Sequence, residues 1–247
     1  MTNLILYVLP YLAVLIFLAG CLCRLTLWLR APVPLKIPLT PAPTTFAGVV
    51  ARYAAEILVF RTLFTGDRLL WLASWVFHAT LAFIVAGHVV GIFLSGLVCK
   101  LRGWTPEQYD RFSALSGGTL GIIILLPLIW LFVRRLNNER VRYISTPGDY
   151  FALLLLLAIV ITGECLRFAP DIHLADVRDY LIGLATFRFA APPNSALFVW
   201  HFLFVNALLI YAPFGKLLHA GGIFFSPPLN QLNNPRDQRH VNPWETD

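Results

Sequence analysis

Residues 77–89 read Phe-His-Ala-Thr-Leu-Ala-Phe-Ile-Val-Ala-Gly-His-Val, which places His78 and His88 inside one long apolar stretch. A second apolar stretch carries His201 and His219. Ionisable side chains in hydrocarbon are costly and rare, and they usually mark a pathway, a relay or a ligand site. One such histidine is more often a hydrogen-bonded interior residue, but two in each of two segments match the two axial histidines that each of two haem irons needs. The sequence therefore predicts two bis-histidine haem sites.

The composition is that of a membrane protein. Of 247 residues, 58% are hydrophobic and only 13% are charged, whereas soluble domains carry roughly 25% charged residues. A membrane-spanning helix needs about 20 apolar residues, and five stretches qualify: 4–29, 69–99, 113–133, 149–168 and 195–219. We predict an all-α membrane protein whose five transmembrane helices form one dihaem cytochrome b bundle at 1–220, followed by a C-terminal tail at 221–247.

The placement of charge predicts the topology. Thirteen of the nineteen lysines and arginines lie near the C-terminal ends of the first and fifth spans, in the connections after the first and third spans, or in the C-terminal tail. Cytoplasmic loops carry the excess of Lys and Arg, so we expect the N-terminus outside and the C-terminus in the cytoplasm. Topology accounts for the net charge of +6 without nucleic acid. The first span lacks a basic segment before its apolar run, so we expect it to be a retained span rather than a cleaved signal peptide.

The cytoplasmic segment 31–68 has two parts. Five prolines between Pro32 and Pro43 favour an extended run. Residues 46–64 then show apolar side chains at helical spacing, which predicts an amphipathic helix. Two roles stay open for this helix: lying in the membrane interface, or docking a cytoplasmic partner.

The order of the spans pairs the histidines. Spans two and five run antiparallel, so we expect an inner pair, His78 with His219, and an outer pair, His88 with His201. Eighteen residues separate His201 from His219, which puts them on one face of a straight helix, and Pro213 is expected to bend it just before His219. An axial spread above roughly 10 Å forbids one four-histidine zinc or copper site. Two separate two-histidine copper sites would lack ligands.

A pair of haems needs an electron donor and an acceptor. We expect a lipid-soluble quinol or quinone near the outer haem and a soluble redox subunit under the inner one. Because the chain has no iron–sulfur or flavin motif, that partner must supply such chemistry. Glu164 and Arg167 lie three residues apart near the outer end of span four, where they form either an interfacial ion pair or a proton or quinol-headgroup contact.

Three motifs carry a resemblance to a known family. They are Phe77-His78 with 83–88, Ser116-Gly117-Gly118 and 211–219, and they are similar to the gamma subunit of respiratory nitrate reductases. The resemblance implies a five-helix dihaem cytochrome b in a prokaryotic inner membrane, with haem b held by the two histidine pairs and a quinol site beside the outer haem. Nitrate reductases carry lysines ahead of the third helix, where this chain has Tyr109 and Arg111. The residues expected at a quinone site are Tyr109, Arg111, Gly87 and Glu164.

The C-terminal part narrows the resemblance. Residues 221–227, Asn234-Pro235-Arg236 and 239–244 resemble the DsrM cytochrome b subunits of DsrMKJOP complexes in sulfur-metabolising prokaryotes. This resemblance implies a cytoplasmic iron–sulfur partner (DsrK-like), further membrane and periplasmic subunits (DsrJ-, DsrO- and DsrP-like), and electron transfer in sulfur metabolism.

Two rival functions remain open. A nitrate reductase gamma subunit, coupled to a molybdenum enzyme, is of the same broad class. A non-redox membrane scaffold or transporter, whose histidines relay protons, is of another class and would show no haem absorption bands.

Overall fold

The computed structural model describes residues 2–32, 38, 40–169 and 172–233, and within these ranges it contains helices and no strand. Five helices are long and apolar enough to cross a membrane, which confirms the predicted spans. Their bounds are α1 (Thr2–Arg30), α4 (Arg68–Val89), α6 (Pro106–Asn137), α8 (Pro147–Phe168) and α10 (Ala196–Tyr211). The resembling motifs from residue 234 onward, and the rest of 234–247, lie outside the described residues. The division at residue 220 stays a prediction.

Short helices connect and extend the spans. The π-helix η1 (Val90–Leu94) and α5 (Ser95–Arg102) prolong α4 without a loop. The remaining short helices are α2 (Phe46–Val59), α3 (Arg61–Gly66), α7 (Glu139–Tyr143), α9 (Leu174–Ala185), α11 (His219–Gly222) and α12 (Pro227–Asn230).

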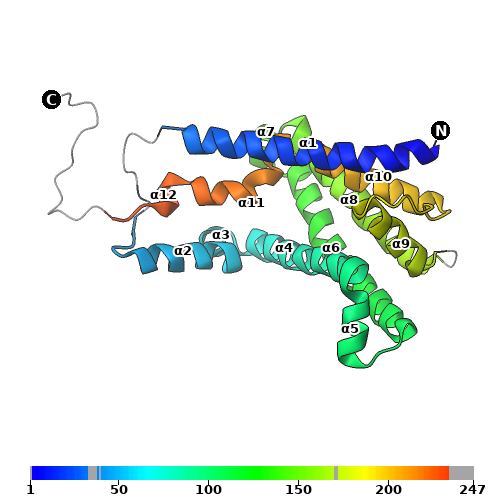
Figure 1. Ribbon diagram of the computed structural model, residues 1–247. Helices are drawn as coiled ribbons and strands as arrows, with labels where there is room; N and C mark the ends of the chain where they lie inside the picture. The colour runs from blue at the N-terminus through cyan, green and yellow to red at the C-terminus, as the bar shows by residue number, and fades with distance from the viewer. Residues whose placement is uncertain (1, 33–37, 39, 170–171, 234–247) are drawn as a thin grey trace.

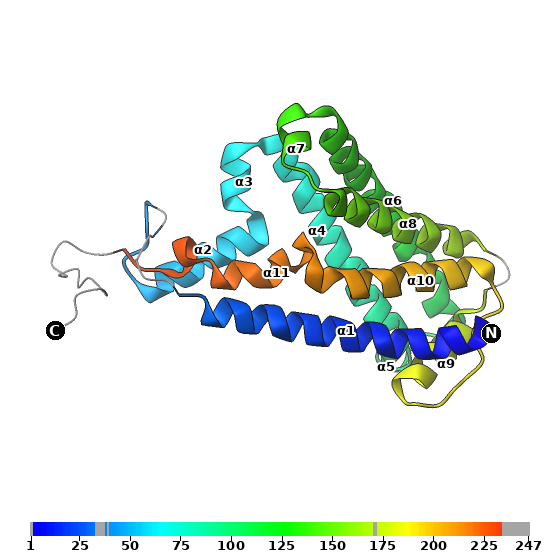
Figure 2. The same ribbon diagram turned by 90° about the horizontal axis from the view of Figure 1, so that it is seen from above.

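The spans pack as a row in which α4 contacts α6, α6 contacts α8, α8 contacts α10, and α10 contacts α1. Figures 1 and 2 show α1 beside α10, with α4 on the other side of the bundle. Phe77, Ile124 and Leu128 form a buried core where α4, α6 and α8 meet. Many other large apolar side chains are exposed, as expected for helices that face lipid. The two ends of the row approach each other, since the His78 ring of α4 lies 5.8 Å from the His219 ring, which follows α10 in the chain. The row is therefore curved.

Span three begins earlier than the predicted 113. Thr105 caps α6: its hydroxyl accepts from the Gln108 amide at 3.3 Å, and the Gln108 side chain accepts from the Thr105 amide at 2.9 Å. Pro106 occupies the first helical position, where its missing N–H costs nothing. Residues 106–112, which precede the predicted span, and span three are therefore one continuous helix.

Span five is broken, so His201 and His219 do not share one face of a single helix as predicted from their spacing. The helix α10 ends at Tyr211, and 3₁₀ turns at Ala212–Phe214 and Lys216–Leu218 flank Gly215, whose backbone is extended. Proline within a helix removes a hydrogen bond and costs about 3 kcal/mol, which explains a break at the buried Pro213. The predicted bend before His219 is confirmed as a complete interruption.

The outer connection between spans four and five folds into a helix that the sequence analysis did not foresee. Tyr180 of α9 is fully buried, and its hydroxyl donates to the Leu6 carbonyl oxygen at 2.7 Å. Burial raises the pKa of Tyr180, so the phenol stays protonated and keeps this bond. Its ring packs on Phe198 and Phe202 of α10. The helix α9 thereby ties the N-terminal ends of α1 and α10 together.

The predicted amphipathic helix at 46–64 is interrupted. Phe60, with φ 50°, lies in the left-handed region and separates α2 from α3. In both views α2 runs roughly along the direction of α1 rather than across it, and it lies toward the C-terminal end of α1 (Figures 1 and 2). It packs on α12, and the Tyr53 ring stacks on Phe224 at 5.9 Å. This orientation differs from that of a helix lying flat in the interface.

Candidate functional site

The helix α4 presents His78 and His88 in the same local arrangement. In each case imidazole Nδ1 lies 2.7 Å from the carbonyl oxygen four residues earlier, at Ser74 and at Ile84. A carbonyl oxygen only accepts, so Nδ1 carries the proton and Nε2 presents a free lone pair. Phe60 and Phe77 pack edge-on against His78, with ring centroids at 5.2 and 5.0 Å.

His219 lies opposite His78. The two ring centroids are 5.8 Å apart and the ring planes are perpendicular, at 89°. Nδ1 of His219 lies 2.8 Å from the Lys216 carbonyl oxygen, so it too carries the proton and leaves Nε2 free. Two histidines on one metal ion, each bonded at about 2 Å, have ring centres about 6 Å apart. The separation of His78 and His219 thus fits two axial ligands of one iron.

His201 is held by α8. Its Nδ1 lies 3.1 Å from the Ile159 carbonyl oxygen and 3.0 Å from the Thr162 hydroxyl, which itself donates to Ala158 at 2.6 Å. A methyl group on Gly163 would come within 3.0 Å of the imidazole, so glycine permits the close approach. His201 lies within electrostatic range of His88.

All four histidines therefore have the same local hydrogen-bond arrangement. Each Nδ1 is bonded to a backbone carbonyl, which fixes the tautomer and orientation, and this is the usual second-sphere arrangement of a metal-binding histidine. Among the described residues, no three His, Cys, Asp or Glu side chains gather around one point. His78 packs against His219, and His201 interacts electrostatically with His88. Such pairs suit a group that takes two axial ligands and fills its other positions itself, as haem does.

The end of the bundle at which α9 lies carries a polar crosslink. Arg178 of α9 donates through Nε to the Gly91 carbonyl oxygen at 2.9 Å, and it pairs with Asp110 of α6. Its guanidinium lies 5.4 Å from the centre of the buried Tyr109 ring. Gly91 belongs to η1, which begins two residues after His88. Single π-turns recur at functional sites, and here Arg178 binds the carbonyl of one.

The predicted Glu164–Arg167 ion pair does not form within the described residues; each side chain instead contacts α6. Carboxylate Oε2 of Glu164 occupies the space that a Cβ on Gly121 would need. The Arg167 guanidinium lies 2.8 Å from the position that a Cβ on Gly117 would take. Oε1 of Glu164 is buried without a hydrogen-bond partner. Arg167 interacts electrostatically with Glu164 and with Tyr109. The Ser116-Gly117-Gly118 motif thus makes room for two charged side chains.

The structure gathers only part of the predicted quinone site. Tyr109 and Glu164 are both linked electrostatically to Arg167. Arg111 is exposed, and within the described ranges no side-chain hydrogen bond or ion pair joins it to Tyr109 or Glu164. Gly87 is also exposed, with open space where a Cβ would be.

Several residues of the site escaped the sequence analysis. The partner of His201, Thr162, and the packing of Phe60 on His78 depend on how helices rotate against each other, which no local pattern reports. Arg178 had a detectable signal, because Val177, Tyr180, Leu181 and Leu184 recur at helical spacing in the outer connection.

Comparison with known proteins finds similarity over most of the chain. The family model "Nitrate reductase gamma subunit" matches residues 37–236. The "Hdr-like menaquinol oxidoreductase cytochrome b-like subunit" of Archaeoglobus fulgidus is 34% identical over 96% of this chain and 82% of its own, and that of Archaeoglobus profundus is 30% identical over 98% and 82%. The nitrate reductase gamma chain of Bacillus subtilis is 30% identical over 64% of this chain and 73% of its own. This multi-pass membrane chain belongs to the nitrate reductase gamma subunit family.

Proposed function

We propose that this chain is a dihaem cytochrome b subunit that moves electrons between the quinone pool and a cytoplasmic iron–sulfur partner. The observation that carries the proposal is the set of four imidazoles in two pairs, each with Nδ1 bonded to a carbonyl and Nε2 free. His78 with His219 would hold the inner haem b, and His88 with His201 the outer one. Bound haem supplies reversible one-electron oxidation and reduction of its iron.

In this proposal, the protein's own residues orient the imidazoles, shield them from water and accept a proton. The carbonyls of Ser74, Ile84, Lys216 and Ile159 fix the imidazoles. Phe60 and Phe77 wall the inner pair from water. Near the outer pair, oxidation of a quinol releases two electrons and two protons, and we propose that Glu164 accepts a proton there while Tyr109, Arg111 and Gly87 line the approach.

The proposed orientation puts the N-terminus outside. Arg134 and Arg135 end α6 at the same end of the bundle as the start of α8, where Lys216 lies. This basic end would face the cytoplasm by the positive-inside rule. The iron–sulfur subunit would then contact α2 and α12 beyond the inner pair.

The relatives favour one kind of complex over another. Those from Archaeoglobus are named as menaquinol oxidoreductase subunits of an Hdr-like type and align with nearly the whole chain, whereas the Bacillus subtilis nitrate reductase chain aligns with 64% of it. We therefore propose a DsrMKJOP-like assembly in sulfur metabolism, with DsrK-, DsrJ-, DsrO- and DsrP-like partners, rather than a nitrate reductase. Identification of the co-purifying subunits tests this assignment.

The haem proposal has a direct test. The purified chain should show b-type α bands in a reduced-minus-oxidised spectrum and two haems per chain by pyridine haemochrome assay. His201→Ala should remove the outer haem and leave the inner one reducible. A colourless protein, or loss of both spectral components from His201→Ala, would contradict the proposal, and a colourless protein would favour a proton relay or scaffold.

A further inference from the structure

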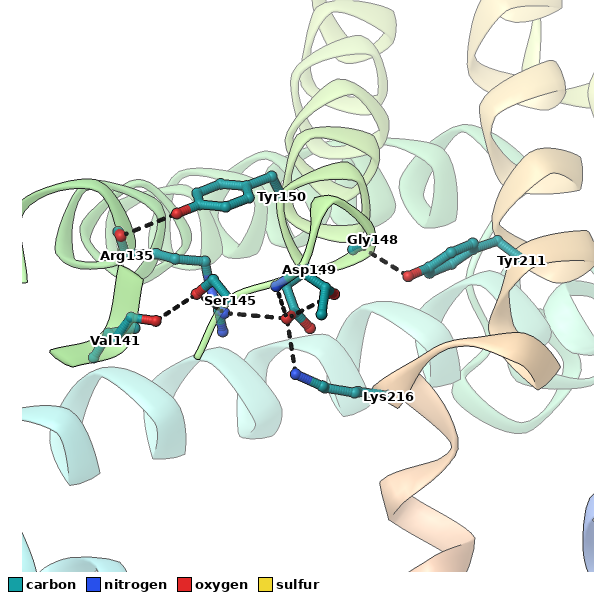
Figure 3. Close-up of polar contacts among 9 residues, drawn as sticks. Arg135, Val141, Ser145, Gly148, Asp149, Tyr150, Tyr211 and Lys216 are labelled. Carbon is teal, nitrogen blue, oxygen red and sulfur yellow. Dashed lines mark hydrogen bonds and ion pairs between the residues drawn. The ribbon is translucent and has the colours of Figure 1, made fainter. Parts of the chain in front are cut away.

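The start of α8 carries a carboxylate with more partners than a helix cap needs. Asp149 is 7% exposed, and its Oδ2 accepts from the Thr146 amide at 2.9 Å and the Thr146 hydroxyl at 3.1 Å. These two bonds complete the cap. The same oxygen also accepts from Lys216 Nζ at 2.8 Å and lies 3.6 Å from Arg135 (Figure 3). Lys216 comes from a segment 67 residues later.

Lys216 joins this carboxylate to the inner histidine pair. Its ammonium binds Asp149, while its own carbonyl oxygen accepts the Nδ1 proton of His219 at 2.8 Å. Three residues thus form a continuous chain of contacts from the first turn of α8 to the imidazole that faces His78.

A second contact fastens the same segment. We call residues 211–219 the strap. The Tyr211 hydroxyl at its start donates to the Gly148 carbonyl oxygen at 2.8 Å (Figure 3). A Cβ on Gly215 would lie 2.7 Å from the Tyr211 ring, so only glycine fits where the strap folds beneath the ring. The strap is therefore anchored to two consecutive residues of α8, one at each end of its fold.

The strap needs such anchors because His219 differs from the other three histidines. His78, His88 and His201 lie on long helices, whose backbone ladder holds them. His219 begins the four-residue helix α11, after two 3₁₀ turns and an extended glycine. No continuous helix fixes its position. The Lys216 side chain is 69% exposed, so solvent screens its ion pair with Asp149 and the pair alone adds little stability. Its effect is on placement.

We propose that Asp149 is a positioning residue for His219, acting through Lys216 to hold the carbonyl that orients the imidazole toward His78. The inference rests on the proposed function, in which His78 and His219 bind the inner haem. It predicts a local effect: the inner site depends on the Asp149–Lys216 pair and the outer site does not.

The sign of the change in midpoint potential distinguishes an effect of charge from an effect of position. If Asp149 and Lys216 acted on the inner haem only through their charges, Asp149→Asn would raise its midpoint potential and Lys216→Met would lower it, because negative charge stabilises ferric iron. If they act by holding the strap, both changes release the same carbonyl and perturb the site in the same way.

The experiment uses the full chain with its haems. Asp149→Asn, Lys216→Met, the double variant and Lys216→Arg are compared with Glu139→Gln, which removes an exposed carboxylate near the same end of the bundle. His78→Ala and His88→Ala assign the inner and outer signals. The readouts are haem retention, low-spin ferric resonances and midpoint potentials, with thermal melting to check folding. Asparagine still accepts hydrogen bonds, so Asp149→Asn keeps the cap of α8.

We expect Asp149→Asn and Lys216→Met each to weaken inner-haem retention about 10-fold. The double variant should retain the inner haem no worse than either single variant, and Lys216→Arg should retain it as the wild type does. In every variant, retention of the outer haem should equal that in Glu139→Gln. Opposite shifts in potential with full inner occupancy, additive losses, or equal loss of both haems would overturn the inference. A wild-type chain without haem would instead overturn the proposed function, and two intact haems in every variant would overturn only the role of Asp149.

Discussion

The Phe60 ring packs edge-on against the His78 imidazole, with the ring centroids 5.2 Å apart and the planes at 85°. Phe60 reaches this position from a left-handed backbone, with φ 50°, which costs a non-glycine residue of order 1–3 kcal/mol. The strain is offset by what the ring covers. Between α2 and α3, the chain turns at a residue whose ring packs on His78, as the ring of Phe77 also does, so the turn and the ring contact come from the same residue.

Replacing Phe60 should separate strain from shielding. Phe60→Gly relieves the backbone but opens His78 to water, which stabilises ferric iron, so the midpoint potential of the inner haem should fall. Phe60→Leu should keep the potential closer to wild type. A redox titration of the two b-type signals measures both.

The chain offers a matched control for that change. Phe187, with φ 57°, is the other left-handed phenylalanine among the described residues, and its ring stacks on Tyr11 at 5.4 Å, away from His78. Phe187→Gly should leave the inner potential unchanged. An equal fall in both glycine variants would mean that Phe60 does not shield the site.

Thr162 should tune the outer site. Thr162→Val removes the hydroxyl that accepts from His201, while the Ile159 carbonyl remains, so outer-haem affinity should fall about 10-fold, at the low end for second-sphere changes. Thr162→Ser should retain the bond. Titration of the apo-protein with haemin, followed at the outer-haem band, measures the change.

The control is Thr119→Val. The Thr119 hydroxyl bonds only to its own helix, at Leu115, 2.8 Å away. Thr119→Val should therefore leave both haems as in wild type, and a loss that matches that of Thr162→Val would argue against a role for the His201 contact.

Gly163 should be needed for its small size. Gly163→Ala places a methyl 3.0 Å from the His201 ring and should displace it, weakening the low-spin outer signal. Gly96→Ala, with nothing within 4 Å, serves as the control. An unshifted outer resonance in Gly163→Ala would show that α8 yields by more than a few tenths of an ångström.

Arg178 should hold the π-turn. Lysine offers a point charge and cannot reproduce the two-sided contact of a guanidinium with Gly91 and Asp110. Arg178→Lys should therefore speed amide exchange at 90–94, with protection of α8 unchanged. Hydrogen–deuterium exchange by mass spectrometry measures it. Unaltered exchange at 90–94 would mean that η1 is stable without the crosslink.

The sequence predicted what long-range patterns encode. Five apolar stretches sufficed for the five spans, and antiparallel connectivity sufficed to set His78 opposite His219, whose rings lie 5.8 Å apart. Ligation of iron by these residues stays a prediction. The bend before His219 followed from Pro213 alone.

What escaped prediction depends on contacts between elements. The expected Glu164–Arg167 pair was wrong because Gly117 and Gly121 offer both side chains space on α6 that an isolated helix does not show. The expected helix at 46–64 breaks because Phe60 gains a tertiary contact with His78. The bend predicted at Pro213 is a complete break, because the extended backbone of Gly215 takes the chain out of the helix.

The break at Pro213 also makes the direction of the His219 imidazole independent of the helical repeat of α10. On an unbroken helix, inserting one residue between His201 and His219 would swing the second imidazole by about 100° around the axis. Here His219 follows a folded strap instead of a continuous helix, so its direction is set by the anchors of the strap and not by the helical repeat of α10. The placement of His219 relative to His201 is thereby separated from the length of α10 that crosses the bilayer.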